Sequence, residues 1–237
     1  GASSVIVEHN FTQFDGFVNT GTIEVRNDVF LEAGADGGTA TILMNHASAN
    51  QTYNNASTAR FAHLRVNKAA GSVSPGVGTT TFLVQQFTLD AGTFNAPTGS
   101  FNVGGFWAGS PTLFVVNGGT FNHNNGTVRF DPDMTDCGQR TATLSTPTVV
   151  TFYNLILDVD DVGCNEDIFA VSGVSSVIVE NDFTQFDGFV NTGTVEVRGD
   201  VFLEAGADGG TATILMNDPA VNQTYNNVST ARFAHLR

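Results

Sequence analysis

The apolar residues of this chain come in short clusters that are separated by turn-forming residues. Val5-Ile6-Val7, Ile23-Glu24-Val25 and Thr41-Ile42-Leu43 begin at equal intervals, and Phe94 and Phe121, each followed by Asn, mark a longer interval of the same kind. Gly and Asn are frequent in the intervening segments, and both residues favour turns. Short strands at such intervals are typical of a β-solenoid, in which the strand of each coil stacks on the strand of the next.

A long internal repeat accompanies these short periods. Residues 3–65 recur at 175–237, with 54 of 63 positions identical. The nine positions that differ are His9/Asn181, Asn10/Asp182, Ile23/Val195, Asn27/Gly199, His46/Asp218, Ala47/Pro219, Ser48/Ala220, Ala49/Val221 and Ala56/Val228. We therefore expect the two copies to adopt the same backbone. Residues 46–49 and 218–221 should be exposed loops, because proline interrupts a strand ladder.

A weaker repeat divides the long period, which runs from residue 3 to residue 175, into two modules of similar length. A Phe-x-x-Leu segment begins at Phe61, Phe152 and Phe233. It predicts a partial module at 1–60 (equivalent to 173–232), module A at 61–151, module B at 152–232 and the start of a further module at 233–237. Residue 237 has the same position in the repeat as Arg65, after which the sequence runs on. We therefore expect further repeats of the same kind to follow.

These periods predict an all-β protein, specifically a right-handed parallel β-solenoid built from tandem modules. Thr, Val and Phe are abundant, and these residues favour strands. The alternative fold is a string of β-sandwiches, one for each module, joined by strand exchange, because the length of a module also suits a sandwich.

Composition narrows the range of partners. Charged residues make up 14% of the chain, against about 25% in typical globular proteins. The formal net charge is −14, which repels the phosphate backbone of nucleic acids, so no nucleic-acid partner is expected. The sequence contains no apolar run long enough to span a bilayer, so we expect no membrane insertion.

The order of motifs resembles that of a known group of proteins. Phe-x-x-Leu segments alternate with Thr-Gly-Thr strands, with Val103-Gly104-Gly105-Phe106-Trp107, with a Gly-Thr-Phe-Asn stretch over 119–131 and with Asn-Gln-Thr-Tyr at 50–53. This order resembles the repeat modules of giant secreted bacterial surface proteins, of the haemagglutinin-like and autotransporter-adhesin-like kind. The resemblance implies a parallel β-helix in an extracellular stalk, filament or adhesin, and it implies no catalytic residues.

Two cysteines, Cys137 and Cys164, lie in the part of the chain that is not duplicated. One disulfide between them is the simplest interpretation for a secreted protein, and the alternative is a pair of buried free thiols. Both lie in acidic stretches, and the carboxylates of Asp131, Asp133, Asp158, Asp160 and Asp161 are candidate ligands for Ca²⁺, which prefers oxygen donors. The alternative is that these residues form solvated acidic turns, and we expect no other cofactor.

The remaining candidate sites are glycosylation sequons and histidines. Asn50, Asn55, Asn222 and Asn227 begin glycosylation sequons that are present in both copies. His9 and His46 are replaced by Asn181 and Asp218 in the second copy, which argues against a ligand or catalytic role. No nucleophile elbow is present, so we predict that the protein is not an enzyme.

The sequence therefore favours a structural role outside the cell or on the cell surface. The first hypothesis is a component of an extracellular filament, sheath or stalk, whose partners are copies of itself in end-to-end or lateral contact. The second is a surface adhesin that binds glycans or another cell. The third is a polysaccharide-active β-helix enzyme, because some parallel β-helices have that activity.

Overall fold

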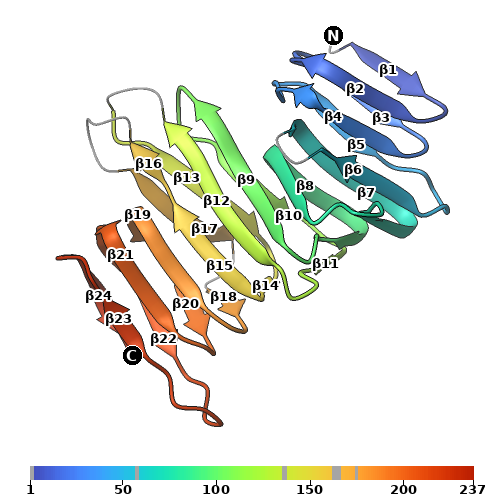
Figure 1. Cartoon of the computed structure of the whole chain (residues 1–237). Helices are drawn as coiled ribbons and strands as arrows, with labels where there is room; N and C mark the ends of the chain where they lie inside the picture. The colour runs from blue at the N-terminus through green and yellow to red at the C-terminus, as the bar shows by residue number, and fades with distance from the viewer. Residues whose placement is uncertain (1–2, 57–58, 135–137, 162–166, 174–175) are drawn as a thin grey trace. The chain divides into compact units, whose positions relative to one another are not determined.

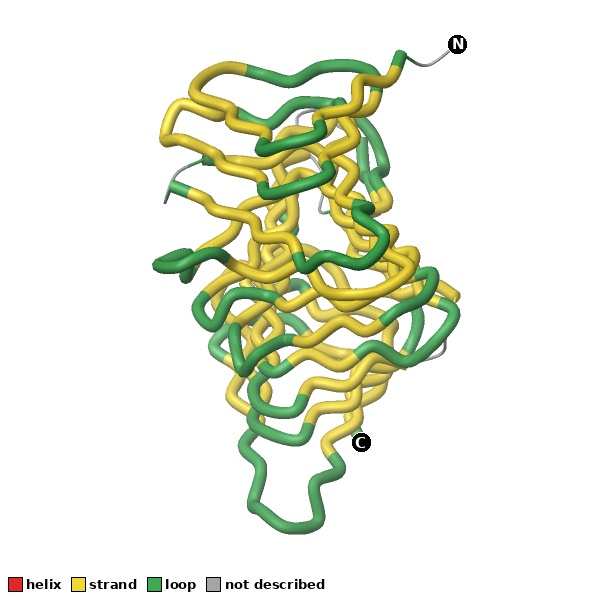
Figure 2. The backbone as a smooth tube through the Cα atoms, turned by 90° about the vertical axis from the view of Figure 1, so that its right-hand side faces the viewer, coloured by secondary structure: helices red, strands yellow, loops and turns green. Residues whose placement is uncertain are grey.

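The computed structural model describes residues 3–56, 59–134, 138–161, 167–173 and 176–237. These residues form strands joined by turns and loops, and no helix is found among them (Figure 2). The strands of successive coils pair in parallel, which confirms the parallel β-solenoid and excludes the sandwich, whose strands would be antiparallel. In the described part of the chain there is accordingly no helix that could cross a membrane.

The chain forms two compact units. Unit 1 comprises residues 1–103 and 115–126, and unit 2 comprises residues 104–114 and 127–237. The strands of unit 1, coloured blue to green in Figure 1, are β1 (Ser4–Val7), β2 (Phe11–Gly16), β3 (Thr22–Val25), β4 (Val29–Ala35), β5 (Thr41–Met44), β6 (Gln51–Asn55), β7 (Arg60–Pro75), β8 (Thr81–Asn95) and β11 (Thr120–Asn122), with parts of β9 (Ser100–Trp107) and β10 (Thr112–Val116).

Unit 2 contains the remaining parts of β9 and β10 and the strands that follow residue 126. They are β12 (Thr127–Met134), β13 (Thr141–Thr146), β14 (Thr151–Phe152), β15 (Asn154–Asp158), β16 (Asp160–Asp161), β17 (Ile168–Gly173), β18 (Ser176–Val179), β19 (Phe183–Asn191), β20 (Thr194–Val197), β21 (Val201–Ala207), β22 (Gly209–Met216), β23 (Tyr225–Asn227) and β24 (Arg232–Leu236).

In unit 1 the coils differ in length. Val5 lies opposite Ile23, and Ile23 lies opposite Ile42 rather than Thr41, so the second step is one residue longer than the first. The constant interval of the sequence analysis is therefore wrong by one residue at the second step. Side chains alternate between the two faces of a strand, and the extra turn residue keeps Ile42 rather than Thr41 directed into the core. The expected stacking of Phe94 and Phe121 is confirmed, because these residues are paired.

The core of unit 1 consists of ladders of equivalent residues from successive coils. Val25, Met44, Val66 and Leu89 follow one another in register, and each is 0% exposed. Their neighbours along each strand are more exposed, which is the alternation that a solenoid wall requires. A short strand cannot bury its apolar face alone, so stacking supplies most of the stability.

Aromatic rings fill the wider coils of unit 1. Phe94 packs against Phe101 with ring centroids 5.4 Å apart and against Phe121 at 6.0 Å. Tyr53 stacks on Phe82 at 4.1 Å and donates a hydrogen bond to the carbonyl oxygen of Asn95 at 2.8 Å. Burial raises the pKa of the Tyr53 hydroxyl, so it remains protonated as a donor.

Unit 2 begins with wide coils and then narrows. Val128 lies opposite Leu155, and further along the chain Phe183 lies opposite Val201, so the earlier coil is half as long again as the later one. The wide coils again contain an aromatic cluster, in which the ring centroids of Phe130 and Phe169 lie 4.8 Å apart.

The two copies of the repeat pair their strands in the same way. Thr22 pairs with Thr41 and Thr194 pairs with Thr213, while the bulge after Gln13 recurs after Gln185. The predicted identity of the two backbones is therefore confirmed at the level of strand register. Residues 46–49 and 218–221 lie outside strands and are exposed, apart from the half-buried first residue of each, so the predicted loops are also confirmed.

One glycine in each copy is required by a close approach of two coils. Gly38 and its equivalent Gly210 have φ of +124° and +137°. A Cβ atom on Gly38 would lie 2.2 Å from the carbonyl oxygen of Val18, and one on Gly210 would lie 2.0 Å from that of Val190. No side chain fits at either position, so glycine fixes the spacing of the coils there.

Candidate functional site

The acidic residues predicted to bind calcium lie on neighbouring coils of unit 2. Asp131 and Asp133 belong to β12, and Asp158 follows them on β15. The guanidinium of Arg129 pairs with Asp158 and lies 3.9 Å from Asp131, so one side-chain cation offsets part of the negative charge of this cluster. No group of three or more metal-binding side chains is found among the described residues. The side chains of Asp160 and Asp161 are not described, and calcium binding stays a prediction.

Cys137 and Cys164 lie outside the described residues. The strands that flank them are described: Met134 pairs with Asp161 before the cysteines, and Thr141 pairs with Ile168 after them. Both of these pairs span the same length of chain as the two cysteines do. The disulfide stays a prediction.

The four sequon asparagines have different surroundings. Asn50 and Asn222 are exposed in their loops. The side-chain amide of Asn55 is buried, and the amide nitrogen of Asn227 donates to the carbonyl oxygen of Ala231 at 2.9 Å. Attachment of a glycan requires an accessible amide nitrogen, so Asn50 and Asn222 are the better placed pair. Glycosylation itself stays a prediction.

His63 is held inside the wall of unit 1 between two threonine hydroxyls. Its Nδ1 lies 3.3 Å from Oγ1 of Thr41, and its Nε2 lies 2.9 Å from Oγ1 of Thr88. Burial, reinforced by repulsion from Arg65 and opposed by attraction to Asp90, lowers the pKa of His63 to about 4. The imidazole is therefore neutral at physiological pH, which suits a structural link between coils.

Three stacked turns form one edge of each copy, and a glutamine holds them together. In unit 1 the three turns follow β1, β3 and β5. Nε2 of Gln51 donates to the carbonyl oxygens of Val25 and Asn27 at 2.9 and 2.7 Å, and its Oε1 accepts from the backbone N–H of His46 at 3.0 Å. We call this edge, residues 8–10, 26–28 and 45–50, corner 1.

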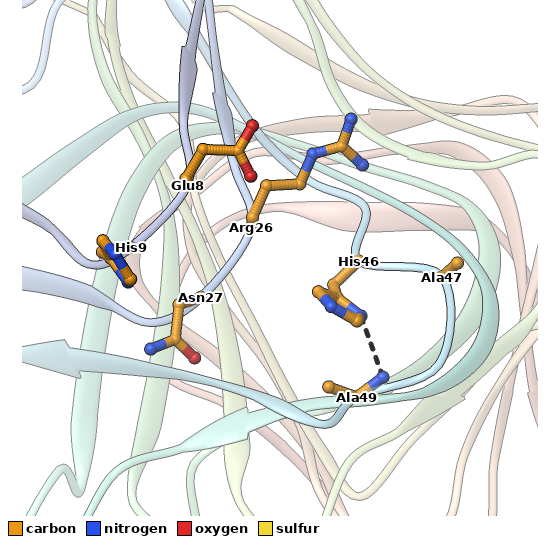
Figure 3. A pocket seen from close by; sticks show the side chains of 7 residues that line it. All are labelled: Glu8, His9, Arg26, Asn27, His46, Ala47 and Ala49. Carbon is orange, nitrogen blue, oxygen red and sulfur yellow. Dashed lines mark hydrogen bonds between the residues drawn. The ribbon is translucent and has the colours of Figure 1, made fainter.

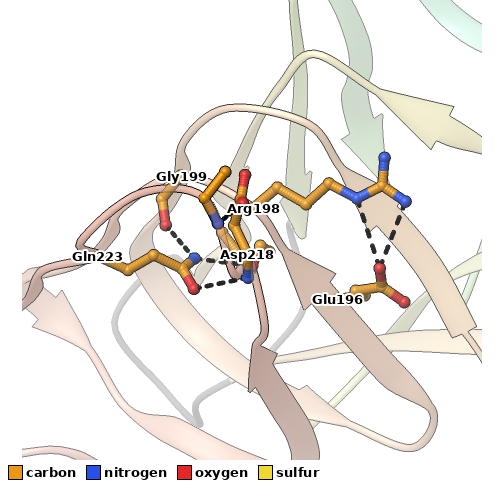
Figure 4. Close-up of polar contacts among 7 residues, drawn as sticks. Glu196, Arg198, Gly199, Asp218 and Gln223 are labelled. Carbon is orange, nitrogen blue, oxygen red and sulfur yellow. Dashed lines mark hydrogen bonds and ion pairs between the residues drawn. The ribbon is translucent and has the colours of Figure 1, made fainter.

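The equivalent edge of unit 2, residues 180–182, 198–200 and 217–222, is corner 2. Gln223 makes the same three contacts, to Val197, Gly199 and Asp218, and Arg198 pairs with Glu196 at 3.5 Å (Figure 4). The backbone frame is therefore the same in both corners.

A buried cation lies behind corner 1. Lys68 is 1% exposed, and its Nζ donates to the carbonyl oxygens of His46 and Ala49, both at 2.8 Å, and to Oε1 of Gln51 at 3.0 Å. All three acceptors are uncharged, so the positive charge has no carboxylate partner among them. Burial accordingly lowers the pKa of Lys68.

The surface of corner 1 is hollowed. The hollow has a volume of about 320 Å³ and is lined by Glu8, His9, Arg26, Asn27, His46, Ala47 and Ala49 (Figure 3). Nδ1 of His46 accepts hydrogen bonds from the N–H groups of Ser48 and Ala49 at 3.3 and 3.0 Å. The neutral ring carries its proton on the other nitrogen, so Nε2–H is a donor that the loop does not use.

The sequence indicates the variable loop at 46–49 but not the corner as a whole. The sequence does not show that the turns at 8–10 and 26–28 lie beside that loop, because this depends on the stacking of three coils. Lys68 was also missed, since nothing in the sequence indicates that this lysine is buried. The sequence does contain one indication of the corner, because seven of the nine differences between the copies lie within these three turns.

Comparison with known proteins yields no relative. No protein family, no curated protein and no solved structure matches this chain.

Proposed function

We propose that this chain is part of an extracellular structural rod, a filament, sheath or stalk, in which coils of one repeat stack on coils of another. The observation that carries the proposal is a difference in burial between the copies. The inward-facing residues Val177, Val179, Phe183 and Val190 of the second copy are 0–1% exposed, whereas their equivalents Val5, Val7, Phe11 and Val18 are half-buried or exposed.

The second copy indicates what fits this face. Its strands β18 and β19 are covered by the preceding coil, in which Phe152 pairs with Val179 and Leu155 pairs with Phe183. No described residue of unit 1 covers the equivalent strands β1 and β2 on that side, and Val5 is 60% exposed. The sequence of this face is therefore compatible with a fully buried contact between coils. We propose that a coil of a further repeat supplies that contact.

Stacking of this kind predicts a definite period. With about 4.8 Å per coil and about 20 residues per coil, each long repeat, such as that from residue 3 to residue 175, advances the rod by on the order of 40 Å. Electron microscopy of the concentrated chain should show rods longer than one molecule, and fibre diffraction should show a strong reflection near about 4.8 Å along the rod axis.

A pair of variants tests the proposed contact. Val5→Asp places a charge on the inward-facing position and should abolish the rods, because the charge would be buried without a partner. Ile6→Asp is the matched control: the equivalent of Ile6, Ile178, is only half-buried in the covered copy, so this change should leave the rods intact. Monomers of the unmodified chain at high concentration, or equal effects of the two variants, would contradict the proposal.

A second candidate function, adhesion at the cell surface, is favoured by one observation. The differences between the copies gather at corners 1 and 2, where side chains change while the backbone frame is kept. Loops that vary on a constant scaffold are typical of binding surfaces. Binding of the chain to cells or immobilised glycans, lost when the corner loops are exchanged, would support this alternative over a purely structural role.

A further inference from the structure

The differences between the two corners are not explained by exposure alone. Asn19 and Thr20 also lie outside strands and are exposed, and their equivalents Asn191 and Thr192 are identical to them. Seven of the nine differences instead lie in the three stacked turns: His9/Asn181, Asn10/Asp182, Asn27/Gly199, His46/Asp218, Ala47/Pro219, Ser48/Ala220 and Ala49/Val221. Five of the seven residues that line the hollow of corner 1 are among them.

The differences that alter ionisable groups all make corner 1 less acidic than corner 2. Asp182 and Asp218 of corner 2 are replaced in corner 1 by the uncharged Asn10 and by His46, and His9 adds a second imidazole. The backbone contacts survive these replacements. Oδ1 of Asn10 accepts from the N–H of Asp28 at 3.2 Å, as Oδ1 of Asp182 accepts from that of Asp200 at 3.0 Å. Corner 1 thus lacks two carboxylates of corner 2 while keeping the same frame.

The groups around the hollow of corner 1 suit an anion. Nε2–H of His46 is an unused donor. Arg26 also lines the hollow, but its guanidinium pairs with Glu24 and points away from His46 in Figure 3. Lys68 places an uncompensated positive charge directly behind the loop, because it binds the carbonyl oxygens of two residues that line the hollow. A buried charge without a counter-charge is costly, and an anion in the hollow would reduce that cost.

We propose that corner 1 is a binding site for a carboxylate group, held by His46 and favoured by the charge of Lys68. Glu8 opposes binding, but its equivalent Glu180 is present in corner 2 as well, so it does not account for the difference. The carboxylate comes either from a small acid or from an acidic side chain of a second copy of this chain, such as the half-buried Asp218. In the proposed stacking the added coil packs on residues 9 and 10, as Asn154 contacts Asn181 and Asp182 in the second copy, so the ligand is held from the side of His46.

The test uses corner 2 of the same molecule as an internal control. Citrate is titrated into the isotope-labelled full chain, and the backbone amide signals of both loops are followed by NMR. Signals of Ser48 and Ala49 should shift with saturation, while those of Ala220 and Val221 should not. Shifts in neither loop, or equal shifts in both, would overturn the proposal.

A double variant converts corner 1 into corner 2. His46→Asp with Ala47→Pro introduces residues that the same frame already carries at 218 and 219, so the fold should be retained. Citrate should then bind about tenfold more weakly or not detectably, because a charge-assisted donor is replaced by a carboxylate. Glu8→Gln should instead strengthen binding. Unchanged affinity in the double variant would contradict the assignment.

A second arm identifies the source of the carboxylate. If a second copy supplies it, raising the protein concentration without citrate should shift the signals of Ser48 and Ala49, and Asp218→Asn should abolish that shift. If a small acid is the ligand, these signals should respond to citrate alone. Either result supports the site, and the absence of both responses would refute it.

Discussion

Protonation of His63 should make the stability of unit 1 depend on pH in a defined range. The imidazole has an ordinary pKa of about 6.5 in the unfolded chain, and burial lowers it to about 4 in the folded chain. Between these values the unfolded state binds a proton that the folded state does not, so the free energy of unfolding falls as the pH decreases. Above about pH 6.5 the imidazole is neutral in both the folded and the unfolded chain, and this contribution to stability is fully present.

The magnitude follows from the shift of the pKa. A difference of about 2.5 units corresponds to about 3 kcal/mol, since each unit is worth about 1.4 kcal/mol. The main cause is desolvation of the ring, and repulsion from Arg65 adds to it, while Asp90 acts in the opposite direction. The loss of stability should therefore develop below about pH 6.5 and level off below about pH 4.

Urea denaturation of the full chain, measured from neutral pH down to below the folded-state pKa of His63, provides the assay. The variant His63→Gln keeps a polar side chain that can contact both threonines but does not titrate. Over this pH range the free energy of unfolding of the variant should fall by about 3 kcal/mol less than that of the unmodified chain. His235→Gln is the matched control, because His235 has the same position in the repeat but is exposed. Parallel pH profiles for His63→Gln and the unmodified chain would refute the reasoning.

Three further predictions concern the framework. Phe94→Ala should lower the free energy of unfolding by about 3–5 kcal/mol in urea denaturation, whereas Phe14→Ala, at a position 73% exposed, should change it by less than about 0.5 kcal/mol; similar effects would contradict the aromatic core. Gly210→Ala should destabilise unit 2 by more than about 1 kcal/mol through its φ and close contact, while Gly109→Ala, with nothing within 4 Å, should be nearly neutral in the same assay. Mass mapping without reduction should find Cys137 joined to Cys164, and recovery of both as free thiols would reject the disulfide.

The sequence specified the repeating architecture closely, because a solenoid is determined by local periods. Phe94 and Phe121 are separated by one coil and are paired in the structure. The identity of the two copies likewise implied one register for both. The equal interval in the sequence predicted that Thr41 lies opposite Ile23, which is wrong by one residue, because the strand residues alone do not show the length of the turn. Only the direction of the Ile42 side chain into the core determines which residue is opposite Ile23.

What only the tertiary structure decided is the proximity of residues from different coils. The sequence shows that His9, Asn27 and His46 differ between the copies, but their positions far apart along the chain give no reason to group them. Stacking of coils brings the three positions to one edge, around a single hollow. Lys68 is a similar case: its burial depends on the loop at 46–50 folding over its side chain and offering oxygen atoms as acceptors. Patterns along the chain thus determined the fold, whereas the candidate site depends on contacts across coils, which the sequence does not encode locally.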